Sequence, residues 1–152
     1  MKGYSSVTFA IRVVTAIVLL VSVWMSLNDY KYTLKELEMR NTLQGIAEYT
    51  EAKVMYSLKM LQNPEFTYFK EKLYLPDLRE DYSVSISCQP NNLLTINASA
   101  PIMGVKYIIK DYINCSSMAL SGTLLPNGER CVTANKTSNS IRIELVNNCD
   151  YV

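Results

Sequence analysis

The sequence contains no histidine and only five glycines and five prolines among its 152 residues. Histidine is the usual general base near neutral pH and the commonest metal ligand, so its absence disfavours most hydrolytic and metal-dependent active sites. The sequence also lacks a glycine-rich phosphate-binding loop, a GxSxG nucleophile motif and an HExxH zinc motif. We therefore expect a protein that is not an enzyme and that carries no cofactor and no metal.

Neither charge sign is in large excess, because the chain has 15 basic and 14 acidic residues and a net charge of +1. A basic face that would bind nucleic acid is not expected from this balance. Glu48 and Glu51 stand one helical turn apart, and we interpret them as a solvated helix surface rather than as an acid/base pair. Asp77, Glu80 and Asp81 lack the spacing of a calcium loop and read as a polar connector.

A long apolar run occupies residues 7–27, and Arg12 is its only charge. About 20 apolar residues in a helix cover the hydrocarbon core of a bilayer, whereas the apolar part of a secretory signal has only about 7 to 15. No small-x-small cleavage site follows Leu27. The run therefore predicts a membrane-spanning helix, and the helical pattern continues beyond it.

Arg12 has two interpretations. Near one end of the span its side chain would reach the cytoplasmic headgroups, while in a packed bundle of such helices it would meet a polar group of a neighbour, such as the amino terminus, a hydroxyl or a carbonyl. Lys2 and Arg12 both lie on the amino-terminal side. The positive-inside rule then places the amino terminus in the cytoplasm and the carboxy-terminal part outside.

Apolar residues recur at helical spacing after the run, and we expect the helix to end at about Gln62, before Asn63 and Pro64. Such a helix is longer than a small domain can bury, so we expect its first half to lie outside the globular part. Gly45 is the predicted weak point, because glycine in a helix costs about 1 kcal/mol relative to alanine. Residues 43–61 are expected to pack on the rest of the chain.

Residues 63–81 are predicted to be a connector with one short helical turn in its first part. From Tyr82 onward the apolar residues alternate with period two, first in YSVSISC and LLTINASA around a turn at residues 89–92. Five or six short strands follow from this pattern over residues 82–152. We predict an α+β fold, in which a long N-terminal helix packs its second half on a small antiparallel sheet or sandwich.

The four cysteines lie in the carboxy-terminal part and have no zinc-like spacing; they are Cys88, Cys115, Cys131 and Cys149. Two disulfides in an oxidising compartment are expected, and the sequence leaves all three pairings open. The same region holds three Asn-x-Ser/Thr acceptor patterns, at Asn97, Asn114 and Asn135. These patterns are candidates for N-glycosylation of an exposed extracellular domain.

Four features follow one another along the chain. They are the basic-small pair Lys2-Gly3, the apolar helix behind it, the helical extension IAEYTEAKVMYSL and the β-rich tail with cysteines. This layout resembles archaeal type IV pilin-like proteins, which have a class III signal peptide. In that family a prepilin peptidase cuts on the cytoplasmic side, ahead of the apolar segment. The resemblance implies a leader at residues 1–3, cleavage between Gly3 and Tyr4, and a mature helix over residues 4–62.

The resemblance also implies the function. The apolar helices of such proteins leave the membrane and pack as the core of a filament on the cell surface, with the β-domains outside. The expected role is therefore a major or minor structural subunit of an adhesive pilus-like filament. Its expected partners are copies of itself, the membrane before assembly, the prepilin peptidase and the assembly machinery. The alternative is a single-pass, signal-anchored cell-surface ectodomain that does not polymerise.

Overall fold

The computed structural model describes residues 3–150 apart from Arg79, Pro90 and Asn127, and it describes side chains from Ser6 onward. Lys2 of the predicted processing site lies outside the described residues, as does the side chain of Tyr4. A single helix, α1, runs from Gly3 to Gln62. The chain divides into two compact units, Met1–Glu38 and Met39–Val152.

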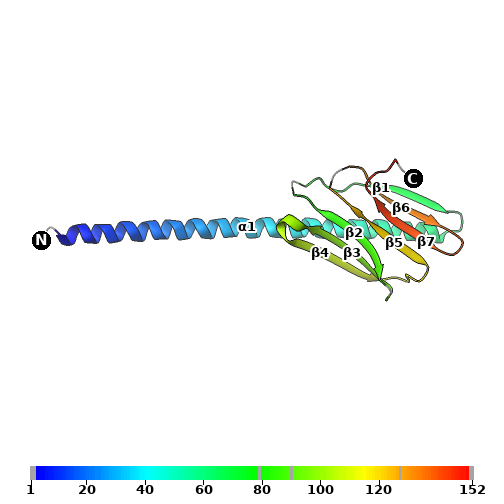
Figure 1. Ribbon diagram of the computed structural model, residues 1–152, viewed down its shortest axis with the longest axis horizontal. Coiled ribbons are helices and arrows are strands. Elements are labelled where there is room, and N and C mark those ends of the chain that lie inside the picture. Colours follow the sequence, from blue (N-terminus) through cyan, green and yellow to red (C-terminus); the bar gives the residue numbers. More distant parts are fainter. Residues whose placement is uncertain (1–2, 79, 90, 127, 151–152) are drawn as a thin grey trace. The chain divides into compact units, whose positions relative to one another are not determined.

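Seven strands follow α1 in the described part of the chain (Figure 1). They are β1 (Tyr68–Leu73), β2 (Ser83–Gln89), β3 (Leu93–Ala100), β4 (Val105–Tyr112), β5 (Met118–Leu124), β6 (Arg130–Lys136) and β7 (Ile141–Val146), with a short 3-10 helix, η1 (Pro101–Met103), before β4. The predicted α+β fold with a long N-terminal helix is confirmed. The compact unit with the strands also includes the helix from Met39 and the 63–81 segment.

The strands form one sheet in the order β1-β6-β7-β5-β2-β3-β4. Neighbouring strands are antiparallel except β5 and β7, which pair in parallel from Met118↔Ile141 to Gly122↔Leu145. Strands β2, β3 and β4 form a meander, and the β2–β3 hairpin predicted around residues 89–92 is confirmed, with Ser83 opposite Ser99. Strands β2 and β5 join the two halves of the sheet through only two residue pairs, Val84↔Leu124 and Ser85↔Thr123.

The second half of α1 supplies one side of the hydrophobic core. Its buried apolar residues lie on one face of the helix: Met39, Leu43, Ile46, Ala47, Val54, Leu58 and Leu61. They share one cluster with alternate residues of the strands, such as Val84, Ile86, Ile96 and Ile143. Figure 1 shows the strands beside this part of the helix. The predicted packing of the helix on the sheet is confirmed.

The helix ends where the sequence predicts. Pro64 has no amide hydrogen to continue the ladder, and the Asn63 amide donates to the Met60 carbonyl at 3.2 Å. Lys136 of β6 donates to the carbonyl of Leu61 at 2.9 Å, which satisfies one of the acceptors left open at a helix end. The helix also continues without interruption through Gly45, the predicted weak point.

The helical turn predicted early in the 63–81 connector is wrong, because the structure forms strand β1 there. The sequence YFKEKL alternates exposed residues with more buried ones, Phe69, Glu71 and Leu73. Phe69 packs edge-on against Tyr56 of α1, and Lys53 of α1 pairs with Glu71. These contacts, together with pairing to β6 from Tyr68↔Asn135 to Leu73↔Arg130, stabilise a strand where the local sequence is ambiguous.

Gly122 of β5 provides a test of the parallel β5–β7 pairing. Its φ is +117°, and a Cβ atom there would lie 2.3 Å from the Leu145 carbonyl oxygen. We expect Gly122→Ala to lower the free energy of unfolding by about 3 kcal/mol. The matched control is Gly104→Ala, at φ +66° with open space around it, for which about 1 kcal/mol is expected. Chemical denaturation of the full chain in detergent measures both; equal losses would contradict the role given to the close approach.

Candidate functional site

The apolar run forms part of α1, and its side chains are exposed. Within the described residues, α1 is the one helix that is long and apolar enough to cross a membrane, and none of its most apolar window is buried. Leu20 and Trp24 are 70% and 65% exposed. Such a surface exceeds what a water-soluble protein ordinarily leaves uncovered and marks a contact with lipid or with protein.

Two hydroxyl groups in this run, those of Thr15 and Ser22, are satisfied inside the helix. Thr15 donates to the Ile11 carbonyl and Ser22 to the Val18 carbonyl, each at 2.8 Å. Buried Thr50 uses the same device, donating to the Ile46 carbonyl at 2.8 Å. A hydroxyl bonded to its own helix can enter an apolar environment at little cost. Arg12 is thus the only side chain of residues 7–27 that carries a charge into the contact.

The cysteines form two disulfides, and the structure selects one of the three open pairings. Cys88 at the end of β2 joins Cys115 in the β4–β5 connection, with their Cα atoms 6.2 Å apart. Cys131 of β6 joins Cys149 in the segment after β7, with Cα atoms 5.6 Å apart. No cysteine is free. Each bridge pins an irregular segment to a strand of the sheet.

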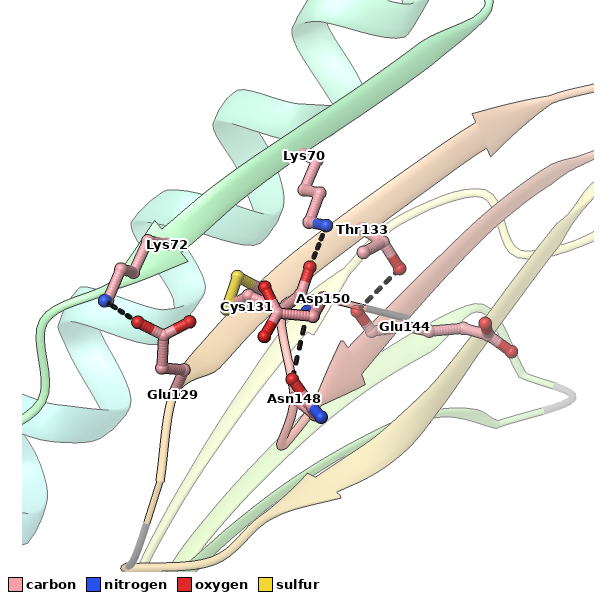
Figure 2. The surroundings of a disulfide bond; sticks show 9 residues. Lys70, Lys72, Glu129, Cys131, Thr133, Glu144, Asn148 and Asp150 are labelled. Carbon is pink, nitrogen blue, oxygen red and sulfur yellow. Dashed lines mark hydrogen bonds and ion pairs between the residues drawn. A yellow bond between two sulfur atoms is a disulfide. The ribbon is translucent and has the colours of Figure 1, made fainter. Parts of the chain in front are cut away.

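Figure 2 shows the surroundings of the Cys131–Cys149 bridge. Lys70 of β1 donates to the Cys149 carbonyl, so the bridged tail also contacts the edge strand of the sheet. Lys72 pairs with Glu129, and this hydrogen bond raises the pKa of the lysine above its ordinary value. The Asp150 amide donates to Asn148 at 3.0 Å. The disulfide and these bonds hold the tail over β6 and β1.

The three glycosylation candidates lie in different environments. Asn114 is exposed in the β4–β5 connection, where its side-chain oxygen accepts from the Ser116 amide at 3.1 Å and hydroxyl at 2.6 Å. Asn135 is exposed near the end of β6. Asn97 is only partly exposed in the middle of β3, and its side-chain oxygen is buried. Asn114 and Asn135 are therefore the accessible candidates.

Arg130 organises a polar cluster that the sequence did not predict. It lies at the start of β6 and is 4% exposed. Its guanidinium donates to the Tyr82 hydroxyl at 2.8 Å, to the Leu75 carbonyl at 3.2 Å, to Asp77 at 2.9 Å and to the Pro126 carbonyl. The cluster thus ties the connector, the start of β2 and the β5–β6 turn together. A lone arginine in a strand gives no sequence signal for such a network.

Tyr82 completes this cluster. Its hydroxyl donates to the Pro76 carbonyl at 2.8 Å, and the Arg130 guanidinium lies 5.7 Å from the ring centre. Burial raises the pKa of the Tyr82 phenol, and the nearby Arg130 acts in the opposite direction. The phenol therefore stays neutral near pH 7. This arrangement fits a structural clamp.

Glu48 and Glu51, which were interpreted as a solvated helix surface, differ in their exposure. Glu48 is exposed and accepts from Gln44 at 2.8 Å, whereas Glu51 is partly buried. The pKa of Glu51 is raised, first by burial and then by the negative charges of Asp111 on β4 and of Glu48. Glu48 and Glu51 of α1 and Asp111 of β4 thus form an acidic cluster. No group of three metal-ligating side chains occurs among the described residues.

The comparisons with known proteins give no assignment: no protein-family model, no curated protein and no solved structure matches this chain.

The disulfide assignment is directly testable. Peptide mapping under non-reducing conditions should recover Cys88 linked to Cys115, and Cys131 linked to Cys149. The mixed alternatives, such as Cys88 with Cys131, should be absent. Because each bridge closes a loop of roughly 20 to 30 residues, replacing either pair with alanine should lower the free energy of unfolding by about 2–4 kcal/mol. Recovery of another pairing would contradict the arrangement of β6 and the tail.

Arg130 should matter more for stability than its exposed partner. We expect Arg130→Met to lower the free energy of unfolding by about 3 kcal/mol, because it leaves buried acceptors without a donor. Asp77 is 90% exposed, so Asp77→Asn should change stability by less than about 1 kcal/mol. Denaturant unfolding followed by circular dichroism measures both. Similar small effects for the two variants would show that the cluster is not a clamp.

Proposed function

We propose that this chain is a structural subunit of an extracellular, type IV pilus-like filament, with surface attachment as its role. The observation that carries the proposal is the uncovered apolar surface of residues 7–27 on the helix whose second half forms the core of the sheet. One helix thus joins an assembly segment to a folded domain. The resemblance to archaeal pilin-like proteins rests on the same layout.

The physical argument concerns the apolar surface. Burying apolar area contributes about 25 cal/mol per Å², so the exposed side chains of residues 7–27 strongly favour an apolar environment. Lipid provides it for a single copy. Identical helices related by a screw operation provide it in an assembly, and such heterologous contacts continue into a fibre instead of closing. The membrane is then the site of the precursor and the filament core is the final environment.

The folded unit suits the exterior of such a filament. Two disulfides are compatible with an oxidising extracellular location, and they stabilise a small sheet that has one helix for its core. Asn114 and Asn135 are accessible for glycans. The proposed pathway therefore cleaves the chain between Gly3 and Tyr4 by a prepilin peptidase, and the assembly machinery then extracts it from the membrane.

The competing function is a signal-anchored ectodomain that remains single in the membrane. Arg12 favours it, because an arginine near one end of a span can reach the headgroups. The two functions differ in whether the apolar segment ever leaves lipid. They also differ in the mature amino terminus.

Shearing the cell surface separates the two functions. We expect the sheared fraction to contain filaments whose subunit begins at Tyr4, with any mass excess on the peptides of Asn114 or Asn135. Intact-mass measurement and amino-terminal sequencing give both answers. A Gly3→Val variant should remain unprocessed in the membrane fraction and form no filaments. A wild-type chain that still begins at Met1 and is found only in membranes would contradict the proposal.

A further inference from the structure

The second half of α1 leaves one face uncovered beside the sheet. Toward β4 and β5 this face borders a groove of about 620 Å³. Ala52, Met55 and Leu58 of α1 form one wall, and Ile113 and Met118 form the other. These five side chains are apolar, and the rest of the lining is Tyr56, Lys59, Gln62 and Asn114. Its apolar walls offer the chemistry that an apolar helix requires, and no described part of the chain fills it.

The charges around the groove are unevenly distributed. At one end lies the acidic cluster, in which Glu51 stands one helical turn before Met55, and Asp111 stands two residues before Ile113. At the other end lies Lys59. Burial raises the pKa of Glu51 most, and the negative charges of Asp111 and Glu48 raise it further. A positive charge placed beside these carboxylates is therefore favourable. A ligand for this groove is therefore apolar and carries a positive charge near one end.

We propose that the groove binds the apolar helix segment of a second copy of this chain, with the neighbour's Arg12 lying between Glu51 and Asp111. The inference rests on the proposed filament and specifies its contact. Residues 7–27 have the required chemistry, since they are apolar and carry Arg12 as their single charge, close to one end. An arginine placed in a packed apolar core costs several kcal/mol unless it is paired, and the acidic cluster supplies the partner.

The helix geometry gives this contact a register. Arg12 and Glu51 are 39 positions apart (51 − 12), so a parallel neighbour would be shifted by about 58 Å along the helix axis at 1.5 Å per residue. The same shift brings Val13 level with Ala52 and Ala16 level with Met55. Leu20 then lies level with Lys59, whose stem can cover apolar surface while its ammonium group stays in water. Charge pairing and apolar packing thus agree on one register.

A charge-reversal cycle on the full-length chain tests this contact. Arg12→Glu and Glu51→Arg should each reduce the yield of sheared filaments at least tenfold, because each puts like charges together. The double variant should recover at least half of the wild-type yield. Asp81→Arg is the matched control: Asp81 is an exposed carboxylate on the loop before β2 and not part of the groove, so its yield should be unchanged.

A second measurement does not depend on a variant that assembles poorly. A photo-crosslinking amino acid at Met55 in otherwise wild-type filaments should link to a peptide within residues 7–27 of another copy. Filaments that form but crosslink elsewhere, or whose single and double charge variants are equally reduced, would overturn this contact and leave the filament proposal standing. Absence of wild-type filaments would overturn both.

Discussion

The folded unit depends on burial of one stripe of α1, from Met39 to Leu61, by the sheet. Among the described residues α1 is the only α-helix, so the apolar faces of seven strands meet this single stripe. A sheet of this kind cannot bury its apolar face alone. Every strand therefore packs on the helix directly or is held by a neighbouring strand that does. Loss of the buried stripe would leave the sheet without a core.

The first half of the same helix is exposed instead of buried. There the apolar side chains have no partner in their own unit, and the internally bonded hydroxyls of Thr15 and Ser22 prepare the segment for an apolar environment. One helix thus combines a segment buried by its own sheet with a segment whose apolar surface is exposed. The disulfides and the Arg130 cluster act on the remaining weak points, which are the tail, the β4–β5 connection and the turns near β2 and β6.

The sequence predicted those features that depend on local periodicity. The helix to Gln62 and the β2–β3 hairpin follow from apolar residues at helical spacing and then at alternate positions. Strand β1 was missed because YFKEKL mixes aromatic and charged residues, and its conformation is decided by pairing with β6 and by contacts with Lys53 and Tyr56.

Features that depend on contacts between distant parts of the chain could not be predicted from the sequence. The parallel β5–β7 pair, the choice among disulfide pairings and the four-way bonding of Arg130 all join segments that are separated in sequence. Glu48 and Glu51 were interpreted as a solvated helix surface, but the effect of the Asp111 charge on Glu51 could not be foreseen without the fold. Of the candidate site, the sequence therefore predicted the apolar run of residues 7–27 but not the acidic cluster.

The central claim is that residues 7–27 end in contact with other copies of the chain. Electron cryomicroscopy of filaments sheared from cells tests it most directly, because helical reconstruction traces each subunit. We expect a core of bundled N-terminal helices surrounded by the disulfide-bonded sheets. Reconstructed filaments built from another protein, with this chain recovered as single copies embedded in lipid, would contradict it.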